Sequence, residues 1–127
     1  VPVGTAVRYG TDPPTSGPHY DGVAQPGFYR ERSPSYGFLV HNLEHGHVVV
    51  YYHPDRLAPQ ELAFLEELTR RYRGTWDAVL AVPRRDERYV LILTAWRRWQ
   101  RLARFDRQAV EAFVDRFRGR GPERPVR

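Results

Sequence analysis

The chain has 127 residues, of which 41% are hydrophobic and 13% aromatic, a composition that excludes a disordered chain, while the length excludes two full domains. Twenty basic against 15 acidic residues give a net charge of +5. Because there is no cysteine, disulfides, thiolate metal sites, iron–sulfur clusters and cysteine nucleophiles are excluded as well. We therefore expect a single domain over residues 1–127.

The N-terminal third is predicted to be mostly irregular. Thr5–Tyr9 is interpreted as a short edge strand. The stretch from Gly10 to Gly37 then holds ten of the chain's 21 glycines and prolines, which prevents a long helix or a central strand. Aromatic side chains interleave with these residues and could pack on the body of the domain. We expect a long, ordered and functional loop over residues 10–37.

Two β-branched and aromatic runs predict buried strands. His47–His53 (HVVVYYH) has large side chains on both alternating faces, which is typical of a central strand. Tyr89–Thr94 is a second such run. The polar residues Arg84–Glu87 before it predict a turn that pairs it with Asp77–Val82 as a hairpin.

Two helices follow from a 3.6-residue hydrophobic period. The first begins at Pro59 and ends before Gly74, and the second takes Asp106 as its N-cap and ends at Gly119. The sequence therefore predicts an α+β fold, in which a largely antiparallel sheet of three to four strands packs against two helices. The long Pro/Gly-rich N-terminal loop completes it.

The positive charge gathers at the C-terminal end, where ten arginines follow Trp96 and residues 119–127 form a basic tail. A nucleic-acid interface needs a basic surface matched to a groove or a stacking platform. No motif of that kind accompanies these arginines. We therefore interpret them as a solvated surface and do not expect a nucleic-acid partner.

Histidine placement is the main functional clue. His41, His45 and His47 fall within seven residues, and His19 lies in the predicted loop. Neutral imidazole is the commonest transition-metal ligand. If Val40–His45 forms a helical turn, His41 and His45 share one face, and Gly46 would then redirect the chain into the strand.

The sequence predicts a metal site with histidine ligands from two segments. His41 and His45 are expected ligands, His47 is a possible extra one, and the loop can deliver His19 as a further ligand. Glu44 could ligate the ion, hold a ligating imidazole, or act as a general base. Without cysteine or methionine the donors are nitrogen and oxygen, so we expect one Cu(II) or Zn(II) ion, with copper favoured by the affinity series.

Two other functions stay open at this point. The histidines could be structural hydrogen bonders in a non-metal protein-interaction module. A metal-dependent hydrolase with Glu44 as general base is the second alternative. For a metal-free acid/base role of Glu44 with His45, no serine stands in a nucleophile-elbow pattern and no second carboxylate pair is evident. We expect a role in metal binding, sensing or delivery rather than turnover.

Four segments resemble the bacterial family called domain of unknown function 3105 (DUF3105). They are PPTSGPHY at 13–20, LVHNLEHGHVVVYY at 39–52, TAW at 94–96 and GPE at 121–123. The resemblance covers nearly the whole chain and matches the family pattern at His19, His41, Glu44, His45 and Trp96. We expect Tyr20, Asn42 and Trp96 to line the pocket or to hydrogen-bond to its ligands.

The resemblance also implies a location. Members of the family commonly carry an N-terminal membrane-spanning segment with this domain outside the cytoplasm, and a chain without methionine that begins at Val1 fits the loss of such a segment. We therefore expect an anchored, extracytoplasmic domain, whose partners are a metal ion and another membrane or extracytoplasmic protein. The chain departs from the family pattern at His47 and Arg97, where glycine is usual.

Overall fold

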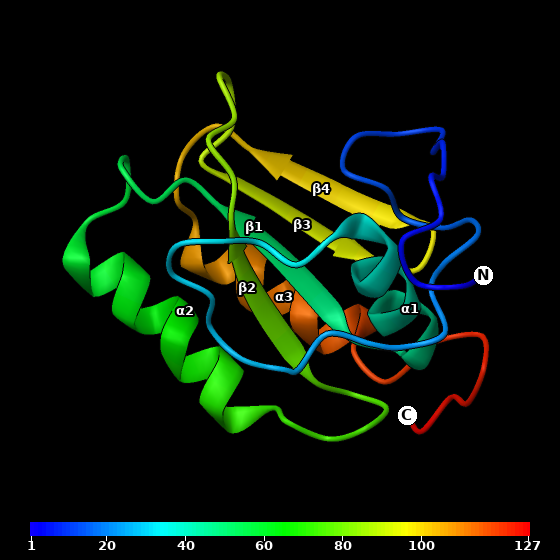
Figure 1. Cartoon of the computed structure of the whole chain (residues 1–127). Coiled ribbons are helices and arrows are strands. Elements are labelled where there is room, and N and C mark those ends of the chain that lie inside the picture. The colour runs from blue at the N-terminus through cyan, green and yellow to red at the C-terminus, as the bar shows by residue number, and fades with distance from the viewer.

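Three helices and four strands make up the α+β fold of the computed structural model, which describes residues 1–127 (Figure 1). In chain order they are α1 (Tyr36–His45), β1 (Val48–Tyr52), α2 (Pro59–Arg71), β2 (Val79–Pro83), β3 (Leu91–Ala95), β4 (Arg98–Leu102) and α3 (Arg107–Phe117). None of the helices combines the length and the apolar character that a membrane span requires. The two predicted helices are confirmed as α2 and α3, the latter with Asp106 accepting a hydrogen bond from the Ala109 N–H.

The four strands form one mixed sheet in the order β2-β1-β3-β4. β1 runs parallel to β2, with Val48 opposite Val79, and antiparallel to β3, with Val49 opposite Thr94. The predicted hairpin between Asp77–Val82 and Tyr89–Thr94 is therefore wrong, because β1 lies between these two strands. Polar residues between two strands do not show whether these strands pair with each other or are separated by a third strand.

Two further differences concern the edges of the sheet. β4 was not among the predicted strands because its sequence, RWQRL, lacks an apolar face, and four of its five residues are exposed in the structure. It forms a hairpin with β3, in which Ala95 stands opposite Arg98. The predicted strand at Thr5–Tyr9 does not form. The sheet is mixed rather than purely antiparallel because β1 and β2 run parallel, while the other two pairings are antiparallel.

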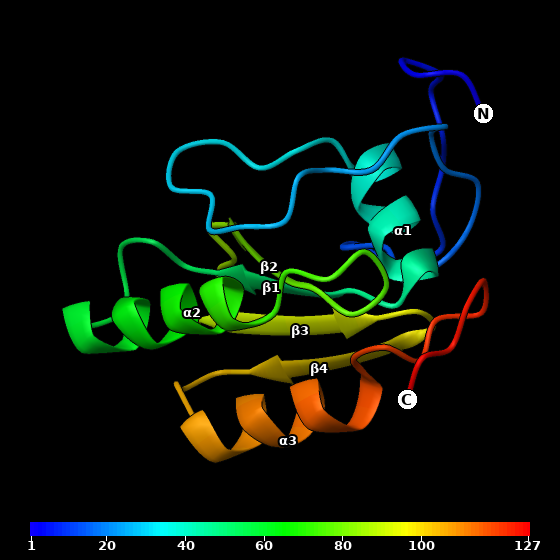
Figure 2. The same cartoon turned by 90° about the horizontal axis from the view of Figure 1, so that it is seen from below.

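The sheet is covered on both faces, as the run of large side chains in β1 requires. Val48, Val50 and Tyr52 pack with residues of α2 and α3, whereas Val49 and Tyr51 pack with α1 and the segment before it. Figure 2 shows α1 and α3 on opposite sides of the sheet. α1 is a ten-residue helix where only a helical turn at Val40–His45 was predicted. Its early residues include glycine and aromatic side chains, which weaken the helical signal.

Residues 1–35 contain no helix or strand, apart from one isolated bridge. Hydrogen bonds nevertheless fix this segment to the body of the protein. The Arg97 N–H donates to the Thr15 carbonyl at 2.9 Å, and the buried Asn42 amide exchanges two hydrogen bonds with the Ala24 backbone. The segment is thus held against both α1 and the β3–β4 turn.

A polar network at the start of α1 adds to this anchoring. The Tyr36 hydroxyl donates to Asp12 at 2.6 Å, and Arg84 contacts both groups. Burial, together with the neighbouring Asp12 carboxylate, raises the pKa of Tyr36 to about 12. The hydrogen bond from Tyr36 in turn lowers the pKa of Asp12, so the pair is a neutral phenol and a carboxylate near pH 7.

The backbone is strained at Arg97, in the two-residue turn between β3 and β4. Arg97 adopts φ +59°, in the left-handed region that costs a non-glycine residue about 1 kcal/mol. Glycine at position 97 would relieve this strain and keep the N–H bond to the Thr15 carbonyl. We expect Arg97→Gly to raise the free energy of unfolding in urea by about 0.5 kcal/mol, after the entropic cost of glycine. The control Arg98→Gly, in β4, should lower that energy, and equal losses for both variants would contradict the strain.

Candidate metal centre

One face of α1 carries three of the predicted site residues. His41, Glu44 and His45 stand at i, i+3 and i+4, so their side chains lie together on the helix surface. The rings of His41 and His45 are 4.9 Å apart. The helix ends at Gly46, which has φ +104°, and the chain turns directly into β1, as the glycine predicted.

His19 reaches this face from the N-terminal segment. Its ring lies 4.8 Å from the ring of His41, and its Nε2 lies 3.3 Å from Oε1 of Glu44. The neighbouring Tyr20 donates its N–H to the Gly37 carbonyl at 3.0 Å. A Cβ at Gly37 would lie 2.6 Å from the Tyr20 ring, so glycine is needed for the segment to lie this close to α1.

All three histidines are oriented in the same way by the backbone. Each Nδ1 donates to a main-chain carbonyl: His19 to Gly17 at 2.9 Å, His41 to Tyr20 at 2.7 Å, and His45 to Thr75 at 3.2 Å. A neutral imidazole that donates through Nδ1 carries its lone pair on Nε2. Metal-ligating histidines commonly have this arrangement, in which a hydrogen bond to one nitrogen fixes the tautomer and leaves the other free for the ion.

The potential ligand atoms form two overlapping groups. One ring nitrogen each from His19 and His41 and one carboxylate oxygen of Glu44 lie within 4.8 Å of one another. We call this the inner group. The outer group consists of His41, His45 and Glu123, with ligand atoms inside the same limit. Both groups offer two imidazoles and one carboxylate, a set of hard and borderline donors suited to a divalent transition metal.

Glu123 was not predicted, and only its place in the GPE segment hinted at it. The C-terminal tail lies against the end of α1, where the Gly119 N–H donates to the Gly46 carbonyl at 2.9 Å. Gly121 packs so closely on the backbone of Glu44 and Gly46 that no side chain would fit. Oε2 of Glu123 thereby comes within 3.6 Å of Nε2 of His45.

Arginines near the C-terminus form ion pairs and hydrogen bonds with the rest of the domain. Arg127 pairs with Asp115 at 3.2 Å and donates to the Arg118 carbonyl, which ties the end of the chain to α3. Arg118 itself pairs with Asp77 at 3.0 Å and lies over the ring of Tyr72. These contacts hold the tail, and therefore Glu123, beside the histidines.

His47 belongs to neither group. It is buried, its Nδ1 accepts a hydrogen bond from the Asn42 amide at 2.9 Å, and its Nε2 donates to the Thr75 carbonyl at 2.7 Å. Burial lowers the pKa of His47 to about 4, which keeps the ring neutral. Both ring nitrogens of His47 therefore take part in hydrogen bonds within the fold. In this conformation neither nitrogen is free to act as the extra metal ligand that the sequence predicted. Asn42 supports the fold here by joining His47 to Ala24.

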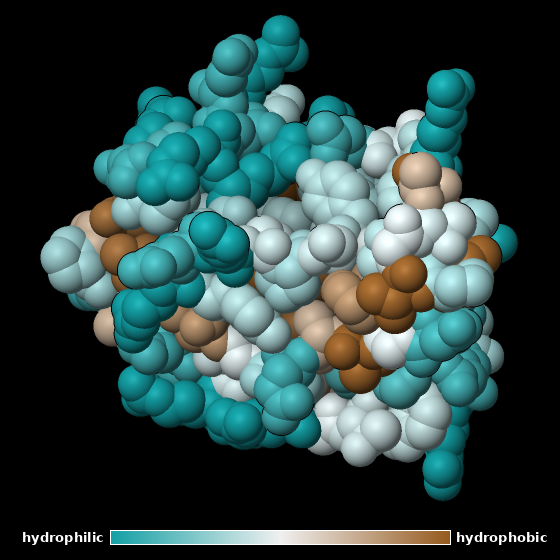
Figure 3. All heavy atoms as spheres, viewed as in Figure 1, coloured by the Kyte–Doolittle hydropathy of each residue, from teal (hydrophilic) through white to brown (hydrophobic).

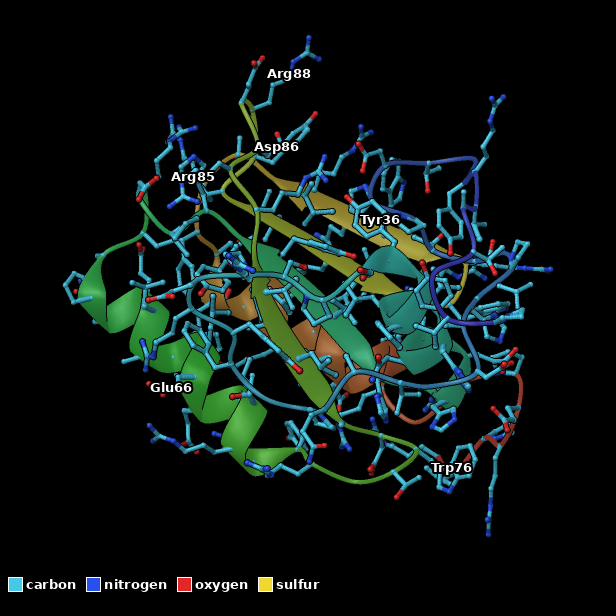
Figure 4. The ribbon with its side chains drawn as sticks, viewed as in Figure 1. Tyr36, Glu66, Trp76, Arg85, Asp86 and Arg88 are labelled. Carbon is cyan, nitrogen blue, oxygen red and sulfur yellow. The ribbon has the colours of Figure 1, made fainter.

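Two tryptophans flank the histidines. The Trp96 ring meets the His19 ring edge-on at 6.4 Å, and the Trp76 ring lies 4.5 Å from that of His45. Trp76 is labelled in Figure 4, in the connection between α2 and β2. Sequence reasoning singled out Trp96 but not Trp76, because nothing in the pattern indicates that this connection passes the end of α1.

The face of the molecule drawn in Figure 3 is largely hydrophilic, with a small apolar group over α1 and the segment before it. Large hydrophobic side chains with substantial exposure are few: Val1, Val3, Val23, Trp99 and Val126. The side chains of His19 and Glu44 are 22% and 26% exposed. An ion at the inner group would therefore keep contact with solvent and have positions open for water or another ligand.

A model of the family described as "Protein of unknown function (DUF3105)" matches residues 1–127. The match includes every residue of both donor groups. No curated protein and no solved structure matches the chain.

Proposed function

Because the chain belongs to the DUF3105 family, whose description assigns no activity, we propose from its own donor groups that it binds one divalent transition-metal ion. The ligands are His19, His41 and Glu44, and the ion is Cu(II) or Zn(II). The observation that carries the proposal is the common orientation of the histidines, each with Nδ1 held by a backbone carbonyl. Nε2 of His19 then lies 3.3 Å from the Glu44 carboxylate, and one ring nitrogen of His41 lies within 4.8 Å of the donors of both residues.

The distances within the inner group support an ion. Ligand atoms about 2.1 Å from a tetrahedral zinc are about 3.4 Å apart, and Nε2 of His19 lies 3.3 Å from Oε1 of Glu44. With the proton of His19 on Nδ1, these two atoms present lone pairs to each other, which is unfavourable unless a cation or proton lies between them. A bound cation would turn that repulsion into two coordination bonds.

A second line of support is that the side chains at the site come from four separate segments of the chain. The four segments that resemble the family contribute His19, the three donors of α1, Trp96 and Glu123, respectively. These residues come from distant parts of the sequence and meet at one end of α1. Polar side chains that converge on one cluster from distant parts of the chain are better explained by a ligand than by packing.

We assign the ion a role in binding, sensing or delivery rather than in turnover. Glu44 is itself a donor of the inner group, so it is not left over as a general base for the hydrolase alternative. Copper is favoured because nitrogen and oxygen sites bind Cu(II) most tightly among first-row divalent metals. We further propose that the domain acts outside the cytoplasm, anchored by a preceding membrane segment, with another extracytoplasmic or membrane protein as its partner.

Thermal unfolding with and without metal tests this function. Protein dialysed against a chelator should take up one equivalent of Cu(II) or Zn(II), and its Tm should rise because the ion binds only the folded chain. At a free metal concentration 100 times Kd, the stabilisation should be about 2.7 kcal/mol. If neither metal binds stoichiometrically and Tm stays constant, the interaction module with structural histidines becomes the better account.

A further inference from the structure

The outer group has no part in the proposal above. It comprises His41, His45 and Glu123, and it shares His41 with the inner group. We infer that the outer group is a loading position, which takes a divalent transition metal from solution and passes it to the inner group. This inference rests on the proposed function, because it specifies how the same ion reaches and leaves its site.

The shared histidine makes the two positions alternatives. Nδ1 of His41 donates to the Tyr20 carbonyl at 2.7 Å, so this ring has a single nitrogen to offer a metal. An ion bound by His41 in one group therefore excludes a second ion bound by His41 in the other. The chain should bind one ion with high affinity although it has two sets of three donors.

The outer group has the more accessible carboxylate, although the His45 side chain, at 15%, is less exposed than that of His19, at 22%. The side chain of Glu123 is 42% exposed, compared with 26% for Glu44, and it belongs to the C-terminal tail rather than to a helix. A carboxylate in this position attracts a hydrated cation and offers it the first protein ligand. His45 follows directly, since its Nε2 is 3.6 Å from the Glu123 carboxylate.

Transfer between the positions needs no full release of the ion. His41 stays bound while the bonds to His45 and Glu123 break and those to His19 and Glu44 form. Each position supplies two neutral imidazoles and one carboxylate, so the charge around the ion is the same before and after. The rings of His19 and His45 lie 4.8 Å and 4.9 Å from the ring of His41, which makes the exchange a short movement.

Stopped-flow kinetics with Zn(II) and Cu(II) alone tests the inference on the full chain. Glu123→Gln should slow both uptake and chelator-driven release by about tenfold, while Kd changes less than about twofold, because a loading position affects both directions equally. Glu44→Gln removes a ligand of the final site and should weaken Kd by at least about tenfold. Glu87→Gln, an exposed carboxylate in the β2–β3 connection, controls for the loss of one negative charge and should change neither rate.

The outcomes separate the two proposals. If Glu123→Gln weakens Kd as much as Glu44→Gln does, all the donors form one site and the loading position is refuted, although the metal-binding function stands. If Glu123→Gln leaves both rates unchanged, the loading position is equally refuted. If the parent protein binds neither metal, the proposed function itself fails.

Discussion

Replacing His41 with alanine is expected to abolish stoichiometric metal binding, with an affinity loss of at least about 100-fold, or about 3 kcal/mol. His41 is the one donor common to both groups, so its removal leaves two donors in each. No other single substitution has this effect, because loss of His19 or His45 leaves one group complete. Isothermal titration of the dialysed variant with Cu(II) and Zn(II) measures the change.

His53→Ala is the matched control. This histidine is half-buried just after β1, and it belongs to neither donor group. Its variant should bind one equivalent with the affinity of the parent. Circular dichroism must show that His41→Ala is folded, since the substitution also removes the hydrogen bond to Tyr20. A folded His41→Ala protein that binds metal like the parent would exclude both donor groups as ligands.

Gly46→Ala should be the most destabilising of the substitutions considered, at about 3 kcal/mol. Gly46 has φ +104°, which strains any residue with a side chain, and a Cβ there would lie 2.5 Å from the Trp76 carbonyl oxygen. It would also lie 3.0 Å from the Gly121 nitrogen. The backbone must move, and because the tail packs on this glycine, Glu123 should move with it. Urea unfolding of the metal-free protein gives the change in free energy.

Gly10→Ala provides the comparison for this stability measurement. A Cβ at Gly10 meets nothing within 4 Å, and φ is not in the left-handed region. The substitution should change the free energy of unfolding by less than about 0.5 kcal/mol. Similar losses for the two variants would mean that the close approach of the tail to the end of α1 contributes nothing to stability.

Sequence reasoning could find the donors on α1 because their spacing is local. An i, i+4 pair of histidines followed by glycine predicts a shared helix face and a sharp exit, and both are present. His19 was predicted from the chemistry of a metal site rather than from any spacing. Its position depends on Gly37 and Tyr20, whose close packing leaves no periodic pattern in the sequence.

Neither the position of Glu123 nor the buried, hydrogen-bonded state of His47 could be predicted from local sequence pattern. Glu123 reaches His45 only because the chain returns from α3 and packs Gly121 on the backbone of α1. His47 alternates with His45 as though both faced the site, yet burial and the Asn42 amide commit its ring to the fold. Contacts between distant parts of the chain place Glu123 beside His45 and bury His47. The spacing of residues along the sequence gives no information about such contacts.

In the fold too, features set by neighbouring residues were predicted better than features set by contacts between distant residues. Amphipathic periods and caps located α2 and α3, since a helix is defined by neighbouring residues. Strand pairing was predicted less well, because the pairing of β1 with both β2 and β3 joins segments that are far apart in the sequence. β4 gains its stability from pairing with β3 and not from an apolar face of its own.

Anomalous diffraction from crystals grown with one equivalent of Zn(II), recorded at the zinc edge, locates the ion among the proposed ligands. We predict one strong peak bonded to ring nitrogens of His19 and His41 and to the Glu44 carboxylate, at about 2.0–2.2 Å from each. Weak density beside His45 and Glu123 would agree with partial occupation of the outer group. A zinc ion bound elsewhere on the chain, or no ordered zinc at all, would contradict the account.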